Sequence, residues 1–206
     1  MRKILTVLFT LLIATSAYAD FSKGANAYNS GDYRTALKEL LPYANEGDAE
    51  AQWALGSMYR WGYGVLKDYS EARKWFEKSA NQGNGKSSAQ LASMYWWGEG
   101  VGGVSPRNAN ISTKWWKKAA EQGDIIAMYK VGLIYAKGFD VPQNKSEAKK
   151  WFKLAYSQAS SDLKQSSKAS QTLLEDIKRA NDSMERGYFD KPISVQYYYG
   201  EGMGWF

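Results

Sequence analysis

Residues 51–83 read AQWALGSMYRWGYGVLKDYSEARKWFEKSANQG, and this stretch decides the fold. Its first part places apolar side chains on one helical face, at positions i, i+3, i+4 and i+7: Ala51, Ala54, Leu55 and Met58. A second stripe with the same periodicity follows: Ala72, Trp75, Phe76 and Ser79. The glycine-containing residues 62–68 separate the two stripes. The stretch therefore predicts two helices joined by a short turn.

The same pattern recurs along the chain. Glycine stands at positions 47, 83 and 123, tyrosine at 59, 95 and 135, and tryptophan at 75, 115 and 151. Each set is spaced by 36 and 40 residues in one order or the other, and the irregularity is explained by four extra residues in the loop at 102–107. Single helical hairpins cannot bury their apolar faces alone, so repeated hairpins are expected to stack into an α-solenoid.

Residues at the predicted helix ends support these boundaries. Asp68 and Asn144 are predicted N-caps of second helices, each with a glutamate three residues later. Gly47, Gly83 and Gly123 stand where a helix ends on a left-handed residue. Gly56 is small enough to let a neighbouring helix approach closely.

Several motifs of residues 51–83 and their later copies resemble the Sel1-like repeat, a relative of the tetratricopeptide repeat: Leu55-Gly56, Gly62-x-Gly64-Val65, Trp75-Phe76 and Ala119-Ala120-Glu121-Gln122-Gly123-Asp124. The resemblance covers about residues 21–158 and implies an all-α solenoid of antiparallel helical hairpins. The sequence departs from the pattern at the loop insertion, at Phe139-Asp140-Val141, and at Ala159, where a terminating glycine is usual.

The chain divides into four predicted segments. Residues 1–19 combine a basic start, a short apolar run and an Ala-Tyr-Ala site, which is typical of a cleaved signal peptide. Residues 20–160 form the solenoid, with a partial first repeat and about three hairpins. Residues 161–187 form an amphipathic helix that covers the end of the solenoid, and residues 188–206 form an aromatic, glycine-rich tail. We therefore expect an exported protein of a bacterial periplasm, with no transmembrane segment in the mature chain.

Composition excludes many enzyme classes. The chain has no Cys and no His, which removes disulfides, Cys-His zinc sites, catalytic cysteines and histidine bases. Cleavage after Ala19 would remove Arg2 and Lys3 and lower the net charge from +6 to +4. This charge is not gathered in one stripe, so a nucleic-acid partner is not expected.

The remaining catalytic motifs have simpler interpretations. Gly98-x-Gly100-x-x-Gly103 follows a predicted helix instead of a strand, so it is interpreted as a turn and not as a dinucleotide site. Two Ser-x-x-Lys matches, at residues 146–149 and 161–164, lack the partner motifs of penicillin-recognising enzymes. The carboxylates Asp162, Glu175 and Asp176 are predicted on a solvated helix face. No catalytic residue, metal site or cofactor is predicted, and a β-lactam or glycan hydrolase is the less favoured alternative.

The aromatic residues give the strongest functional signal. Trp75, Trp115, Trp116 and Trp151 lie on the buried stripes and are expected in the core. A second face of the first helices, which the resemblance places on the concave surface, and the ends of these helices carry the predicted partner-binding residues: Trp53, Arg60, Trp61, Trp96, Trp97 and Tyr129. Trp and Arg are enriched at protein-binding hot spots. We therefore expect a non-catalytic adaptor that binds a protein or peptide in this groove. The alternative is a module for peptidoglycan or envelope polysaccharide, because flat aromatic faces suit sugar rings.

The tail carries a second pattern. Ile193, Val195, Tyr197 and Tyr199 alternate with other residues, which indicates an extended segment that docks on its own solenoid or on a partner.

Overall fold

The computed structural model describes residues 21–103, 105–162 and 168–186 of the 206-residue chain. These residues contain no strand, and the all-α prediction is confirmed. After a helical segment at residues 21–30, the helices are α2 (Tyr33–Glu46), α3 (Ala49–Trp61), α4 (Tyr69–Asn81), α5 (Gly85–Trp97), α6 (Pro106–Glu121), α7 (Ile125–Lys137), α8 (Lys145–Asp162) and α9 (Lys168–Glu185). They form two compact units, divided between Gln82 and Gly83.

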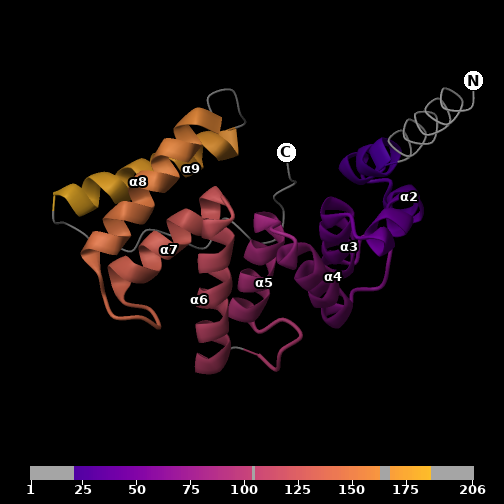
Figure 1. Cartoon of the computed structure of the whole chain (residues 1–206), viewed down its shortest axis with the longest axis horizontal. Helices are drawn as coiled ribbons and strands as arrows, with labels where there is room; N and C mark the ends of the chain where they lie inside the picture. Colours follow the sequence, from indigo (N-terminus) through magenta and orange to yellow (C-terminus); the bar gives the residue numbers. More distant parts are fainter. Residues whose placement is uncertain (1–20, 104, 163–167, 187–206) are drawn as a thin grey trace, which may run out of the picture. The chain divides into compact units, whose positions relative to one another are not determined.

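In the first unit, α3 packs between α2 and α4 (Figure 1). The predicted close approach at Gly56 is confirmed, because a Cβ on Gly56 would lie 2.6 Å from Cδ1 of Phe76. The hydroxyl of Ser79 donates to the carbonyl of Ala49 at 2.6 Å and ties the end of α4 to the start of α3. The α3–α4 hairpin is therefore held together by the contact between Phe76 and Gly56 and by the hydrogen bond from Ser79 to Ala49.

The second unit repeats this arrangement twice and ends with α9 (Figure 1). Helix α5 pairs with α6, and α7 pairs with α8. Gly132 on α7 lies against Phe152 on α8 as Gly56 lies against Phe76, with a built Cβ 2.5 Å from Cε1 of the ring. Helix α9 packs on α8, and its apolar side chains Leu173 and Ile177 are buried in the same core.

The predicted caps form as expected. Asp68 accepts hydrogen bonds from the backbone N–H groups of Ser70 and Glu71, and Asn144 accepts one from Glu147. Gly47, Gly83 and Gly123 all adopt positive φ. These turns need a left-handed residue, and glycine adopts that conformation without a Cβ penalty.

The inserted loop differs from the prediction that its four extra residues all lie in the loop at 102–107. Helix α6 begins a turn earlier than its counterparts, with Ser105 as the N-cap, so part of the insertion becomes helix. Asn108, which is aligned with the caps Asp68 and Asn144, is instead buried within α6. Its Nδ2 donates to the carbonyls of Gly103 at 2.6 Å and Val101 at 3.3 Å. The side chain therefore anchors the loop.

The glutamines that precede Gly83 and Gly123 each link the two helices of their own repeat. Gln82 donates from Nε2 to Oε1 of Gln52 at 2.8 Å, and Gln52 in turn donates to the carbonyl of Ala44 at 2.9 Å. In the next repeat, Ser88 donates to Oε1 of Gln122 at 2.6 Å. The Gln-Gly pair thus closes the base of both hairpins.

The tryptophans of the second helices are not equally buried. Trp75 and Trp116 are in the core as predicted, whereas Trp115 and Trp151 are only half-buried and pack at its edge. Lysine ammonium groups one turn later lie over two of the rings, Lys78 over Trp75 at 4.0 Å and Lys118 over Trp115 at 4.7 Å. The prediction of full burial is therefore wrong for Trp115 and Trp151.

The predicted C-terminal helix begins later than residues 161–162. Helix α8 continues through Ala159 to Asp162, and α9 starts at Lys168. Because Ala159 replaces the usual glycine, no left-handed residue ends α8 at the expected position. The predicted signal peptide, at residues 1–19, and the tail, at residues 188–206, lie outside the described residues.

Candidate ligand-binding site

The end of helix α5 presents two exposed tryptophans. Trp96 and Trp97 are its last residues, and Gly98 ends the helix with φ of 72°. A Cβ on Gly98 would collide with the backbone of Gly103, so the loop can close tightly only because this residue is glycine. The side chains of Trp96 and Trp97 remain 39% and 47% exposed.

Phe139 lies beside Trp96 in the same unit. It follows α7 and the left-handed cap Gly138, and its N–H donates to the carbonyl of Ile134. The rings of Trp96 and Phe139 meet edge to face with 6.4 Å between centroids, and Phe139 is 47% exposed. The Lys137 ammonium lies 5.8 Å from the Phe139 centroid. We call Trp96 and Phe139 the aromatic patch, with Lys137 at its rim; the exposed Trp97 follows Trp96 in the chain.

The repeat itself does not require a tryptophan at position 96. The corresponding residue is Arg60 in the preceding repeat and Ala136 in the following one, and both are buried. An arginine and an alanine thus both pack in the interior at this position. The middle repeat instead carries a tryptophan that remains partly exposed to water. Exposed aromatic surface of this kind is typical of binding sites.

In the first unit the structure places the predicted residues differently. Trp53 is only 8% exposed, and its ring lies 5.8 Å from that of Tyr28. Arg60 is fully buried, with its guanidinium 4.6 Å from the centroid of the half-buried Trp61. The expectation that Trp53 and Arg60 line an open surface is therefore wrong, because both side chains are buried. Burial also raises the pKa of Tyr28 to about 12.

Tyr129 is also buried. Its ring packs 5.8 Å from that of Phe152, and burial raises the pKa of its hydroxyl, with a further contribution from Asp176 of α9. The expectation that Tyr129 is exposed is therefore wrong, because its ring packs against Phe152 of α8 and is buried. Of the six predicted partner-binding residues, the structure therefore leaves only Trp96 and Trp97 clearly exposed, both at the end of α5.

Sequence reasoning missed Phe139 and Lys137 as parts of a site. A signal was present, since Phe139 begins the one turn in which the glycine-rich pattern of the repeat is replaced. The contact with Trp96 joins two repeats, however, and periodicity within one helix cannot predict it.

The described residues include several of the motifs that the sequence offered for catalysis. They contain no cluster of acidic side chains that could hold a metal ion. Glu175 and Asp176 both lie within salt-bridge distance of Arg179, at 3.5 and 3.4 Å. Gly98-x-Gly100-x-x-Gly103 is a turn after a helix, as interpreted from the sequence. The ammonium of Lys130 has its pKa lowered to about 8 by burial.

The stacked antiparallel hairpins define an α-helical solenoid repeat protein. The chain belongs to the Sel1 repeat family, whose model matches residues 49–84, 86–124 and 125–160. Repeats of this family generally serve as scaffolds for protein interaction. No curated protein matches the chain significantly. In the described residues, no helix combines the length and the apolar character needed to cross a membrane.

Two solved structures are similar to this chain. A Sel1 repeat protein from Oxalobacter formigenes is 30% identical over 68% of this chain and 98% of its own, with a TM-score of 0.55. The protein c5321, a protective antigen of uropathogenic Escherichia coli with an SLR fold, is 28% identical over 84% of this chain, with a TM-score of 0.62. This chain spans 38% of the length of that second protein.

Proposed function

We propose that this chain is an exported, non-catalytic adaptor that binds a protein or peptide ligand at the aromatic patch. The observation that carries the proposal is the exposure of Trp96 at a repeat position where Arg60 and Ala136 are buried. The packing of the repeat does not require a large ring at this position, since Ala136 fills it in the next repeat. A ligand that covers the rings would gain their burial, and tryptophan is the residue most enriched at such hot spots.

The chemistry of the patch indicates the kind of ligand. The rings of Trp96 and Phe139 offer apolar faces and edges, and the Lys137 ammonium adds one positive charge beside them. An apolar or aromatic side chain next to a carboxylate would satisfy both features. A peptide segment can supply an apolar side chain and a carboxylate side by side. Its backbone can stay hydrated at the rim of the site, so its polar groups need not be buried.

Export rests on residues 1–19 and is tested separately. The full-length chain, expressed in a Gram-negative host, should be recovered from the periplasmic fraction with Asp20 as its first residue, as read by intact-mass measurement. A chain that keeps residues 1–19 and stays with the cytoplasmic fraction would contradict the exported part of the proposal.

The ligand is tested with the mature chain as bait in envelope extract. A specific partner should be lost with Trp96→Ala and retained with Leu66→Ala, which removes an apolar side chain that is 91% exposed in the other unit. Binding should then be reproduced between the two purified proteins. Equal retention by both variants would contradict the proposal.

Polysaccharide binding is separated by sedimentation with purified peptidoglycan. Cosedimentation that depends on Trp96, without any protein partner, would favour the peptidoglycan alternative, since exposed tryptophan faces also suit sugar rings.

A further inference from the structure

The chain beyond α9 is unusually rich in aromatic side chains. Residues 187–206 contain seven aromatic residues and three charged ones: Tyr188, Phe189, Tyr197, Tyr198, Tyr199, Trp205 and Phe206, with Asp190, Lys191 and Glu201. Segments that stay hydrated on their own have the opposite composition, with few aromatics and many charges. Burying large aromatic side chains is favourable, so an apolar surface on which to lie would stabilise this segment.

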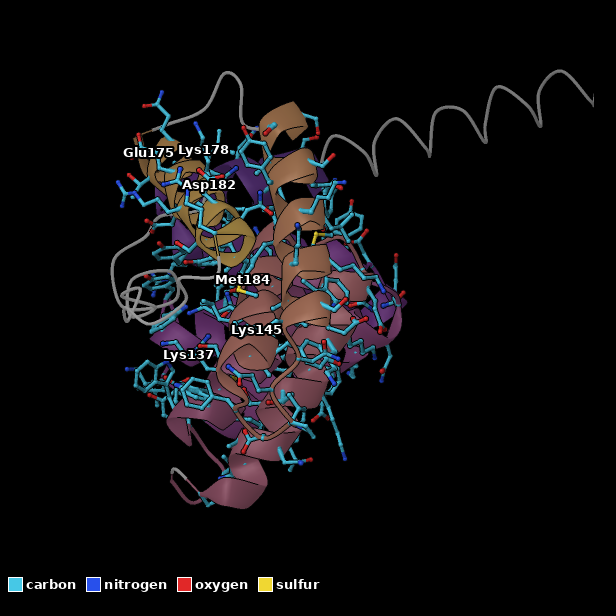
Figure 2. All side chains as sticks on the ribbon, turned by 90° about the vertical axis from the view of Figure 1, so that its left-hand side faces the viewer. Lys137, Lys145, Glu175, Lys178, Asp182 and Met184 are labelled. Atoms are coloured by element: carbon cyan, nitrogen blue, oxygen red, sulfur yellow. The ribbon has the colours of Figure 1, made fainter. Side chains whose placement is uncertain are left out.

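The topology of the second unit delivers this segment to the end that carries the aromatic patch. The link between α8 and α9 is short, so the two helices form an antiparallel hairpin and the end of α9 returns toward the start of α8. In Figure 2, Met184, near the end of α9, lies on the side of Lys145 and Lys137, whereas Glu175, in the middle of α9, lies farther from them. Met184 also packs against the core of this unit.

Lys137 and Phe139 belong to the turn at that end, and Phe139 contacts Trp96. The described part of the chain stops at Arg186. The ten residues between Arg186 and Tyr197 can span up to about 35 Å when extended. That reach exceeds the roughly 20 Å length of a 13-residue helix such as α7. An extended segment of this length could therefore pass along a whole helix of the unit.

We propose that the C-terminal segment, residues 193–199 above all, docks in cis on the aromatic patch of its own chain. The alternation of Ile193, Val195, Tyr197 and Tyr199 lets an extended strand turn one apolar face toward the rings of Trp96 and Phe139. The docked segment occupies the surface that an external ligand would need. This goes beyond the proposed adaptor function, because it concerns what covers the patch when no partner is present.

The test uses the purified, full-length mature chain with the photo-crosslinker p-benzoylphenylalanine in place of Phe139. We expect a crosslink to residues 193–199 that leaves the chain at monomer mass, as mapped by peptide mass spectrometry. The same crosslinker in place of Leu66, in the other unit, should give no such product. Replacing the three tyrosines at 197–199 by serine should abolish the crosslink, whereas Ser194→Ala with Gln196→Ala should retain it.

Side-chain oxidation provides a readout that needs no modified residue. In the full chain Trp96 should be oxidised by hydroxyl radicals several-fold more slowly than in a chain ending at Arg186, with circular dichroism confirming that both are folded. A crosslink at dimer mass would assign the segment to a second copy and overturn docking in cis. Absence of any crosslink together with equal oxidation of Trp96 would also overturn it. Because only the purified chain is used, these results are independent of whether a partner is found in envelope extract.

Discussion

Gly56 of α3 lies directly against the ring of Phe76 of α4, so close that a Cβ on Gly56 would lie 2.6 Å from the ring. The next repeat replaces the pair with Ala92 and Trp116, and the third restores it with Gly132 and Phe152. The smaller residue and the ring thus vary together along the stack.

Gly56→Ala should therefore destabilise the protein although alanine is the better helix former. Overpacking a core costs about 1–3 kcal/mol, and the gain in helix propensity offsets about 1 kcal/mol of that. Chemical denaturation should show a net loss of up to roughly 2 kcal/mol. Adding Phe76→Leu to Gly56→Ala should cost less than the sum of the two single changes, and strict additivity would show that the ring is not the cause.

Trp96→Ala and Trp116→Ala should have opposite consequences. Trp96 is exposed, so its removal should change the free energy of unfolding by well under 1 kcal/mol. Trp116 is buried, and its truncation should cost about 3–5 kcal/mol. Thermal melts of the two variants provide the comparison. A melt of Trp96→Ala as low as that of Trp116→Ala would place Trp96 in the core and remove the basis of the candidate site.

Asn108→Asp should destabilise the loop between α5 and α6. If Asn108 acted as an N-cap, aspartate would replace it well. It donates from Nδ2 to the carbonyls of Gly103 and Val101, and an ionised carboxylate can only accept. We expect a loss of about 1–3 kcal/mol and faster proteolysis at residues 98–105. The matched change Asn144→Asp, at a true cap, should leave stability nearly unchanged.

Lys130 should make stability rise between pH 8 and pH 10. Burial lowers its pKa from 10.5 to about 8 in the folded chain, so in this window the unfolded chain binds more protons. The penalty for burying the charge is complete below pH 8 and is relieved as the folded form deprotonates above it. Denaturation curves from pH 7 to 10 should show the rise in the natural chain and lose it in Lys130→Met. An unchanged rise in the variant would assign it to other groups.

The repeat architecture could be predicted from the sequence because its determinants are local. Helix periodicity, the acceptors at Asp68 and Asn144, and the left-handed glycines act within a few residues, so position and residue type suffice. The family's Gln-Gly pair was also visible, although its bond from Gln82 to Gln52 was not. The partner of a polar side chain lies on another helix, and spacing along the chain does not identify it.

The sequence by itself determined which residues share a helical face, because 3.6 residues per turn fixes that relation. Only the tertiary structure decided which second face is covered and which stays open. Trp53, Arg60 and Tyr129 occupy the same kind of face as Trp96, yet they are buried, whereas Trp96 meets the ring of Phe139 edge to face and remains 39% exposed. Asn108 likewise holds the spacing of a cap but serves as a loop anchor, because the insertion lets α6 begin earlier at Ser105. Whether a side chain is buried depends on the residues that pack against it from other helices. Those contacts form only when the repeats pack together.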